Sequence, residues 1–388
     1  MEKTDRRLNR REFLQSGAMT ALAVGLAPSA LKAQEKKQDE VKRYRKKICN
    51  YQKDMLYRRM GNEDVWFSVI SLGGGGLKEA LAYHAIDRGV NLVHMAAGYA
   101  AGNSLDMLAS VLKNRKNRIY VALKDGFSRE APDDIDPVLK RLGIDTVDFI
   151  MFNRHRAERV ADPAIRERFE TWKAQGKVRY AGLTTHEDVK ACLAAGIDFG
   201  LYSVIQPALP QSGLEMSVEE LKKACERGVA IMPMKTMRDL RDEGLQTAYL
   251  KKMLANPAVT TVNKSFNTFE MFDAYLNAAR ETLTAEEDMR LYRYARENRS
   301  GRCAMCGECT KACPRHIEVC GTLLCKTYYH EQLGDEESAL AFFREIPENR
   351  RHEGNCTKCG LCEMACPNSM RIVQKLEETT DLFKKRFV

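Results

Sequence analysis

Two cysteine runs near the C-terminus constrain this chain more than any other feature. Both have the spacing C-x2-C-x2-C-x3-C-P, and their cysteines are Cys303, Cys306, Cys309 and Cys313 in the first run and Cys356, Cys359, Cys362 and Cys366 in the second. This spacing presents three thiolates from one tight loop and leaves the fourth cysteine for a neighbouring site, which is typical of 4Fe-4S ligation. The runs therefore predict two 4Fe-4S clusters.

Zinc and disulfide bonds are the alternative uses of these cysteines. Structural zinc sites usually pair two C-x2-C knuckles and need neither a third cysteine nor the proline that follows each run. Zinc is therefore less favoured than iron–sulfur clusters, and disulfide bonds are less favoured still. Cys320 and Cys325, between the runs, are expected to pack in the interior, with a disulfide bond as the alternative.

The cysteine-rich segment resembles the bacterial-type ferredoxins, in which the fourth cysteine of each run binds the other cluster. The resemblance implies one cluster on Cys303, Cys306, Cys309 and Cys366, and a second on Cys356, Cys359, Cys362 and Cys313. We expect a ferredoxin-like domain over residues 301–375, followed by a C-terminal tail over residues 376–388.

The N-terminus carries an export motif. Residues 9–15 read NRREFLQ, which matches a twin-arginine signal, and an apolar run from Gly17 to Ala27 and a cleavage position after Ala33 follow. An amphipathic helix with accidental arginines is the alternative. The twin-arginine route exports folded proteins, whereas secretion of an unfolded chain would expose its thiols to an oxidising compartment. We therefore predict a signal peptide over residues 1–33, export by the twin-arginine translocase and a periplasmic location.

Charge and hydropathy exclude two other classes. The formal charge of +9 is partly carried by the predicted signal peptide, and two clusters, each about −2 with its thiolates, would offset much of the remainder. No basic stripe is interleaved with aromatic residues, and no stretch reaches the roughly 18 apolar residues of a membrane span. We expect neither a nucleic-acid partner nor a stable membrane span. Residues 34–54 are charged and predict a solvated linker.

Between residues 55 and 282, short β-rich runs alternate with segments of helical periodicity. The candidate strands are Ser68–Leu72, Asn91–Met95, Ile119–Leu123, Val147–Phe152, Val178–Leu183, Leu201–Ile205, Val229–Met232 and Val259–Val262. This alternation predicts an α/β fold, a (β/α)8 TIM barrel. A doubly wound sheet is the alternative, but it would require a G-x-G-x-x-G fingerprint, and residues 73–76 are a plain glycine run.

Polar residues follow the second, third and fourth candidate strands, where the catalytic residues of barrels gather. They are His94, Tyr99, Lys124, Asn153 and His155. Here the sequence resembles the aldo-keto reductases, whose second strand closes with D-T-A-x-x-Y, the third with a lysine and the fourth with a histidine. In this chain the tyrosine and the lysine are present, His94 replaces the aspartate, and Asn153 replaces the histidine.

The order of the segments extends the resemblance. The predicted barrel is followed by a helix over residues 283–300, which Thr284 and Glu287 open as a capping box, and then by the cysteine runs. This order resembles the branch of the aldo-keto reductases that carries a C-terminal ferredoxin-like domain.

The resemblance implies roles for the polar residues. Tyr99 donates a proton to a carbonyl oxygen, and the charge of Lys124 lowers the pKa of the phenol, which is about 10 in the free state. His94 removes the anion that would keep Lys124 charged; it could accept a hydrogen bond from Lys124, act as an acid or base, or simply pack at the barrel mouth. Asn153 can orient a carbonyl group but cannot act as an acid, and His155 could turn inward to compensate.

A nicotinamide cofactor is a further implication of the resemblance. The residues at the family's cofactor positions are Thr184, Thr185, Gln206, Met234, Lys235, Lys264 and Ser265. Glu270 stands where the family has an arginine that holds a 2′-phosphate, and its carboxylate would repel that phosphate, so we expect NAD to be preferred over NADP. A nicotinamide transfers two electrons as hydride whereas a cluster passes one, and the sequence has no motif for the flavin that usually connects them.

Two functions are consistent with these features. The first is an exported oxidoreductase that acts on a small carbonyl or alcohol, such as a sugar, and exchanges electrons with a redox protein partner. The second is an electron-transfer protein whose barrel is a catalytically degenerate scaffold. Retention of Tyr99 and Lys124 favours the enzyme, whereas the loss of the other two family residues favours the scaffold.

Overall fold

The computed structural model describes residues 43–115, 118–127, 133–237, 240, 242–326, 339–340, 343–344 and 346–384. The chain divides into two compact units, Met1–Lys47 and Ile48–Val388, and the elements below belong to the second. The predicted signal peptide lies outside the described residues. Within the described ranges, no helix is long and apolar enough to cross a membrane.

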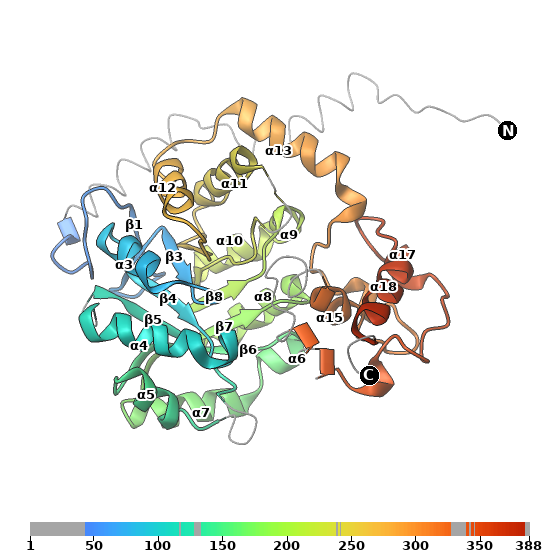
Figure 1. Ribbon diagram of the computed structural model, residues 1–388, viewed down its shortest axis with the longest axis horizontal. Coiled ribbons are helices and arrows are strands. Elements are labelled where there is room, and N and C mark those ends of the chain that lie inside the picture. Colours follow the sequence, from blue (N-terminus) through green and yellow to red (C-terminus); the bar gives the residue numbers. More distant parts are fainter. Residues whose placement is uncertain are drawn as a thin grey trace. The chain divides into compact units, whose positions relative to one another are not determined.

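Eight parallel strands form the predicted barrel (Figure 1). Their order around the sheet is β10-β3-β4-β5-β6-β7-β8-β9, with the bounds β3 Ile70–Gly73, β4 Leu92–Met95, β5 Tyr120–Lys124, β6 Val147–Asn153, β7 Val178–Thr185, β8 Val204–Pro207, β9 Ala230–Ile231 and β10 Val262–Lys264. A parallel bridge between Ile231 and Val259 joins β9 to the segment that leads into β10. The sheet therefore curls back on itself, which confirms the (β/α)8 fold.

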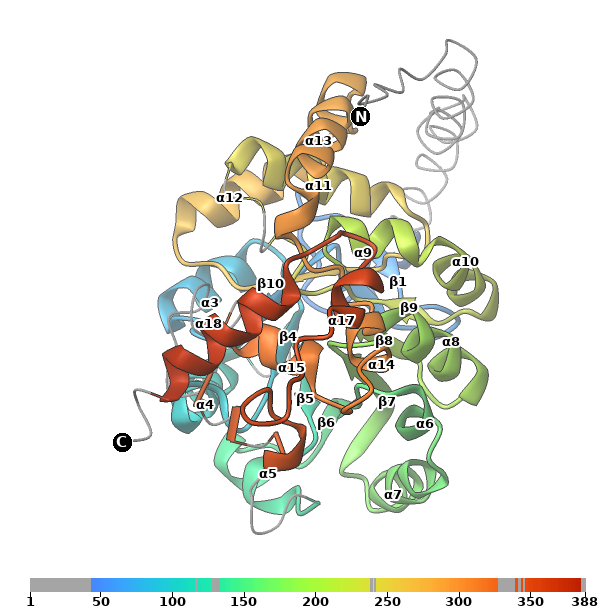
Figure 2. The same ribbon diagram turned by 90° about the vertical axis from the view of Figure 1, so that its right-hand side faces the viewer.

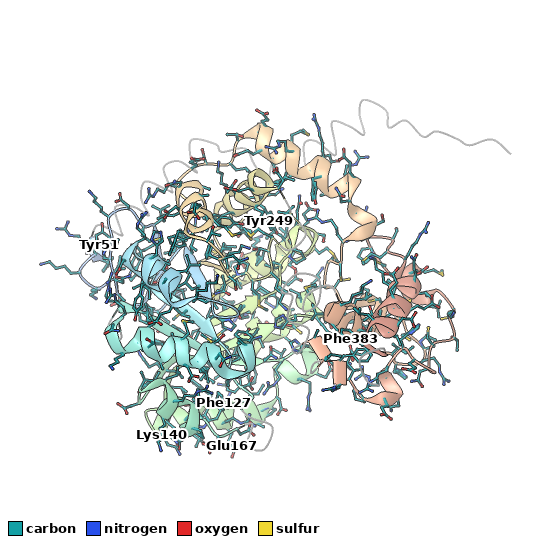
Figure 3. The ribbon with its side chains drawn as sticks, viewed as in Figure 1. Tyr51, Phe127, Lys140, Glu167, Tyr249 and Phe383 are labelled. Atoms are coloured by element: carbon teal, nitrogen blue, oxygen red, sulfur yellow. The ribbon has the colours of Figure 1, made fainter. Side chains whose placement is uncertain are left out.

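Helices on the outside of the barrel connect successive strands. Their bounds are α3 Glu79–Asp87, α4 Asn103–Arg115, α5 Asp136–Leu142, α6 Ala157–Val160, α7 Pro163–Ala174, α8 Val189–Phe199, α9 Gln211–Met216, α10 Val218–Arg227, α11 Glu243–Ala255 and α12 Phe269–Ala278. In α7, the Asp162 carboxylate caps the first turn, and Trp172 faces inward, where its ring lies 5.9 Å from that of Phe127 (Figure 3).

An antiparallel hairpin that the sequence did not predict closes the N-terminal end of the barrel. It consists of β1 Tyr57–Arg59 and β2 Trp66–Ser68. Phe67 is fully buried against Phe149 of β6, with 5.3 Å between the ring centroids. Because the hairpin fills the N-terminal end of the barrel, the opposite, C-terminal end is the one available for chemistry.

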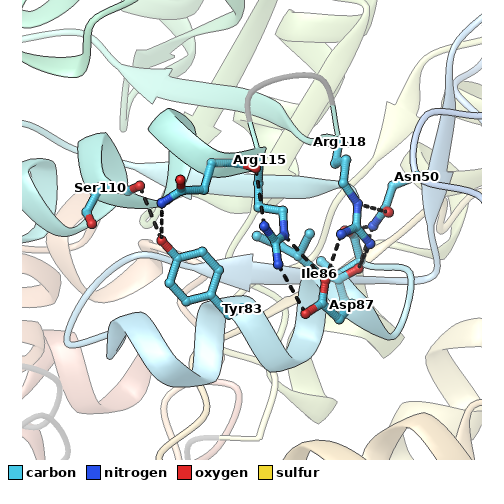
Figure 4. A network of polar contacts seen from close by, with 9 residues as sticks. Asn50, Tyr83, Ile86, Asp87, Ser110, Arg115 and Arg118 are labelled. Carbon is cyan, nitrogen blue, oxygen red and sulfur yellow. Dashed lines mark hydrogen bonds and ion pairs between the residues drawn. The ribbon is translucent and has the colours of Figure 1, made fainter.

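Residues 48–54, predicted as part of a solvated linker, pack against the barrel instead (Figure 4). The Asn50 amide donates a hydrogen bond to the Ile86 carbonyl at the end of α3 (2.6 Å). Arg118 donates to the Asn50 side chain (2.7 Å) and pairs with Asp87 (2.7 Å). The linker prediction was wrong here because polar side chains satisfy the last carbonyls of a helix, and composition does not reveal such a contact.

Helix α13, Ala285–Glu297, leads from the barrel into a cysteine-rich lobe, which we define as residues 299–384. The predicted capping box is confirmed: Thr284 Oγ1 accepts from the Glu287 amide (3.2 Å), and the Glu287 carboxylate accepts from the Thr284 amide (2.9 Å). The elements of the lobe are η3 Arg299–Gly301, α14 Glu308–Lys311, α15 Val319–Leu324, η5 Glu348–Arg350, α17 Leu361–Met364 and α18 Ile372–Lys384.

The two cysteine runs adopt the same backbone conformation. Met305 and Lys358 are left-handed (φ 59° and 54°), and each donates its amide to the first cysteine sulfur of its run (3.4 Å in both). Gly307 and Gly360 (φ 76° in both) then start α14 and α17, in a conformation that glycine adopts without strain. The sequence repeat is thus a structural repeat.

Helix α18 corrects the predicted boundary at residue 375 and the predicted tail at 376–388. The helix runs from Ile372 to Lys384, across that boundary. Leu376 is buried among the cysteines of the lobe, and Phe383 stacks on Phe343 with 5.0 Å between ring centroids (Figure 3). The described part of the predicted tail is therefore largely a packed helix.

The lobe contacts the loops that follow β6, β7 and β8 at the C-terminal end of the barrel (Figure 2). The contacts are Arg156–Glu318 (2.6 Å), Asp188–Lys311 (2.7 Å) and Gln211–Arg302 (3.5 Å). The barrel mouth and the cysteine runs are therefore neighbours.

Candidate functional site

Polar side chains from β4, β5 and β7 meet at the barrel mouth. The ring of Tyr99, in the turn η1 (Tyr99–Gly102), lies 6.5 Å from that of His94, between centroids, and 5.9 Å from Lys124 Nζ. Lys124 Nζ is also 3.0 Å from Nε2 of His186. The structure therefore brings His94, Tyr99 and Lys124 together, and it adds His186, which sequence reasoning missed.

His186 is the hydrogen-bond partner that holds Lys124. Burial lowers the pKa of Lys124 to about 8. Burial, reinforced by the charges of Lys235 and Lys124, keeps the pKa of His186 well below its usual range. A neutral His186 accepts the Lys124 hydrogen bond at Nε2, which leaves the ring proton on Nδ1.

His94 does not accept a hydrogen bond from Lys124, which was one of the roles considered from the sequence. Lys124 pairs with His186, and His94 Nε2 is buried without a hydrogen-bond partner among the described residues. Burial and the charges of Lys124 and Lys235 hold the pKa of His94 well below its usual range. His94 is therefore neutral, and its free ring nitrogen is available to a ligand.

Tyr99 is a protonated phenol. Burial raises its pKa to about 12, against the lowering by Lys124 that the sequence predicted. Burial is the cause of this shift, and the pKa of Lys124, 5.9 Å from the ring, is itself lowered by burial. Tyr99 consequently keeps its proton at ordinary pH and is placed to donate it.

His155 turns toward the mouth, as the sequence allowed. Its Nδ1 accepts a hydrogen bond from the His186 amide (3.2 Å), and the two rings are 5.1 Å apart. Burial, then Lys124 and Lys235, lowers the pKa of His155 to about 3. Asn153, at the end of β6, has a buried Oδ1 without a partner in the described part of the chain.

Asp125, which follows Lys124 in the sequence, forms its contacts with residues at the end of β6. Asp125 pairs with Arg154 (2.8 Å) and accepts from the Asn153 amide (2.7 Å). Asp125 therefore positions the end of β6, and it raises the pKa of Lys124 only enough to oppose burial in part. The mouth is consequently rich in cations and neutral imidazoles.

The predicted cofactor residues lie at or just after the C-terminal ends of strands β7 to β10. Thr184 donates to Gln206 Oε1 (3.2 Å), and Gln206 Nε2 is buried without a partner among the described residues. Thr185 binds the Glu187 carbonyl (3.0 Å), Met234 is buried, and Lys235 is left-handed (φ 55°).

The remaining two cofactor residues, Lys264 and Ser265, lie at the end of the eighth barrel strand, β10. Ser265 Oγ donates to the Gly73 carbonyl (3.2 Å), and burial lowers the pKa of Lys264 to about 8. Glu270 is exposed in the first turn of α12, where its charge opposes anion binding at the helix N-terminus.

The eight predicted cluster cysteines line two separate pockets. One is lined by Cys303, Cys306, Cys309 and Cys366, together with Cys320, and the other by Cys313, Cys356, Cys359 and Cys362. Each pocket therefore contains three cysteines from one run and the fourth from the other, in the sets that the ferredoxin resemblance implied. Most of the other lining residues are apolar, which suits the burial of a cluster, although Arg315 and Thr357 also line the second pocket.

Zinc would require closely spaced sulfurs: four thiolates on one zinc ion would lie about 3.8 Å apart, given Zn–S distances of about 2.3 Å. Among the described residues, no group of three histidine, cysteine or acidic side chains is found that could hold a single metal ion. Each pocket is lined by four of the predicted cluster cysteines, the number that a 4Fe-4S cluster needs.

Two acidic side chains lie between the mouth and the first cysteine pocket. Burial and the neighbouring Glu318 carboxyl raise the pKa of Glu187, which follows His186 in the chain. Glu318 also binds Arg156 from the barrel and Arg350 from the lobe. Cys320 and Cys325 are both buried, in agreement with the predicted packing role.

Comparison with known families identifies both parts. A model of the aldo/keto reductase family matches residues 77–289, more than half of the chain. This chain belongs to the aldo/keto reductase family. A 4Fe-4S binding domain matches residues 350–371, which hold the second cysteine run. An aldo/keto reductase barrel followed by an iron–sulfur domain makes this protein an iron–sulfur oxidoreductase.

One solved structure supports the fold of the reductase barrel. The holo form of the aldo-keto reductase AKR11C1 from Bacillus halodurans matches with a TM-score of 0.51 and 20% identity, over 62% of this chain and 96% of that one. Its apo form matches with a TM-score of 0.49 and 20% identity, over 62% and 95%. No curated protein matches the chain in sequence.

Proposed function

We propose that this reductase is exported, carries two 4Fe-4S clusters, oxidises or reduces a small carbonyl or alcohol substrate at the barrel mouth, and exchanges electrons with a redox protein partner. The observation that carries the proposal is the retained Tyr99 and Lys124 pair, in a mouth whose flanking loops contact the cysteine-rich lobe.

Tyr99 is the proposed proton donor to the substrate oxygen. Its high pKa keeps the proton available, and burial makes a hydrogen bond to the substrate stronger than it would be in water. His94, Asn153 and His186 each present a buried atom without a partner among the described residues, and these atoms would orient the hydroxyl and carbonyl groups of the substrate.

A nicotinamide, with NAD preferred over NADP, fits part of the site. The free Nε2 of Gln206 is a buried donor that would bind a carboxamide oxygen, while Lys264 and Ser265 stand at the phosphate end. The exposed Glu270 disfavours a 2′-phosphate. NAD would supply hydride chemistry when bound.

The second cysteine pocket is the proposed docking region for the redox partner. Cys359 is exposed there, and so are Leu361 (41%) and Met364 (82%) on α17. Clusters supply one-electron transfer, and a solvent-facing cluster site is the one that another protein can approach.

The test replaces Tyr99 with phenylalanine in the purified, cluster-loaded protein. Aldoses, polyols and hydroxy acids are incubated with it anaerobically, and turnover is followed with ferricyanide or a reduced viologen as the electron carrier. We expect Tyr99→Phe to lower turnover about 100-fold or more, since general acid catalysis contributes at least that much. Iron should remain at about eight atoms per chain, as two clusters require.

Tyr83→Phe is the matched control, because the Tyr83 hydroxyl contacts Ser110 and Asn114 on the outside of the barrel. Unchanged turnover in Tyr99→Phe would refute the role of the phenol. If no compound is turned over by a fully loaded protein, the degenerate-scaffold function is supported instead.

A further inference from the structure

A pocket rich in arginine opens beside the barrel mouth. It has a volume of about 460 Å³ and lies at the end of β6, against α6 and the first turn of α7. Its charged and polar lining consists of Asn153, Arg154, His155, Arg156, Arg159, Asp162 and Arg168. This volume lies in the range of small-molecule sites and suits a ligand of monosaccharide size.

Three of the four arginines are held in place by carboxylates from different elements. The pairs are Arg154–Asp125 (2.8 Å), Arg156–Glu318 (2.6 Å) and Arg168–Asp133 (2.5 Å). A guanidinium has five N–H donors, and one carboxylate engages at most two of them. The pairs therefore orient the guanidinium groups and leave donors for another anion.

Arg159 is the arginine with the most freedom to bind. It lies on α6, its side chain is exposed, and it forms no ion pair within the described part of the chain. The carboxylate in the pocket lining, Asp162, is engaged with the Ala164 amide at the start of α7. The charge of Arg159 is thus available to a ligand.

The inner end of the pocket is electropositive and also offers an acceptor. The charges that act on His155 come from Lys124, Lys235, Arg154 and Arg156, all of them cations. Next to it, the buried Oδ1 of Asn153 has no donor among the described residues. A ligand that satisfies both features carries an anionic group and a hydroxyl group.

We propose that this pocket binds the anionic group of a hydroxylated acid, a sugar carboxylate or a sugar phosphate, and directs its hydroxyl-bearing part toward Asn153 and the barrel mouth. This names the substrate class of the reaction and to that extent rests on the proposed function. Arginine forks match the paired oxygens of carboxylate and phosphate alike, so the two sources are separated by experiment.

Binding is measured by isothermal titration calorimetry on the full, cluster-loaded protein at constant ionic strength. The probes are D-glucuronate, D-glucose 6-phosphate and neutral D-glucose. We expect at least one anionic probe to bind tenfold or more tightly than glucose, and Arg159→Gln to weaken that binding about tenfold, as loss of a charge-assisted hydrogen bond does. The stronger anionic probe identifies the carboxylate or the phosphate.

Arg166→Gln is the matched control, because Arg166 lies on the outside of α7 and binds the Phe199 carbonyl instead of lining the pocket. Equal binding of glucose and both anions, or equal weakening by Arg166→Gln and Arg159→Gln, would overturn the proposal. The titration needs no turnover, so it remains decisive if the barrel proves to be a scaffold.

Discussion

His94 stands where an aspartate would keep the buried Lys124 charged. A neutral histidine supplies no such anion, so burial is opposed only in part, by Asp125. Lys124 consequently takes His186 as its partner, and its pKa falls to about 8. The protonation of the lysine in this site therefore differs from that in a reductase with the usual aspartate.

Lys124→Met tests this electrostatic consequence through stability. A pKa of about 8 in the folded state, against 10.5 in the unfolded state, means that folding a charged Lys124 is unfavourable below about pH 8. At 1.36 kcal/mol per pKa unit the cost is about 3 kcal/mol, and loss of the His186 hydrogen bond offsets about 1 of it. We expect Lys124→Met to be more stable than the parent at pH 7 by about 2 kcal/mol.

The advantage should shrink as pH rises from about 8 to 10, because the unfolded parent then binds more protons than the folded parent and the parent gains stability. Urea unfolding at several pH values measures the difference. Lys113→Met, at an exposed position of α4, should show no such trend. A gap that stays constant with pH would contradict the lowered pKa of Lys124.

At the scale of elements, the sequence predicted what local patterns determine. All eight barrel strands are present, yet some begin up to three residues later than predicted, as β8 does at Val204. The hairpin containing Phe67 was missed because three-residue strands carry too little periodicity to be recognised. His186 was missed although it follows a strand end, the one signal that could have revealed it, because the family positions assigned the end of β7 to the cofactor through Thr184 and Thr185.

Helix α18 is a second element that local sequence patterns did not predict. Its charged residues favour a solvated tail, and only the fold reveals that Leu376 and Phe383 are buried. The residues that Phe383 meets, among them Phe343 and Ile346, belong to a segment far from it in sequence. Such a contact depends on tertiary structure, and local composition cannot predict it.

Phe383→Ala tests whether this helix supports the cysteine-rich lobe. Removal of a fully buried aromatic ring costs about 3 to 5 kcal/mol. Because Leu376 of the same helix lies among the cysteines, the loss should speed the release of iron to a chelator several-fold. The release is followed by absorbance. Asp381→Ala, at an exposed position of α18, should match the parent. Equal release rates for both variants would show that the end of the helix is dispensable.

At the scale of the whole molecule, the lobe has an inner and an outer side. Asp188 on the barrel lies against Gly307 and Lys311 near the first cysteine pocket, whereas Cys359 of the second pocket is exposed. Three cysteines of each set were predictable because spacing within a run is local, and the fourth was implied by the resemblance to the bacterial-type ferredoxins. The ion pair Arg156–Glu318, which ties the lobe to the barrel, joins distant residues and was not. The geometry that we propose for electron exchange therefore came from the fold alone.

Export is the property of the whole molecule that we predict from the N-terminal segment. Changing Arg10 and Arg11 to lysine should retain the precursor in the cytoplasm, because the twin-arginine translocase reads that pair. Fractionation of cells and immunoblotting measure the location, and the retained protein should still contain iron. The chain provides its own control, since Arg6 and Arg7 form a second arginine pair outside the motif and their replacement by lysine should leave export unchanged. Export of the Arg10 and Arg11 variant at the parental level would show that residues 1–33 are not a twin-arginine signal, and the proposed periplasmic location would lose its basis.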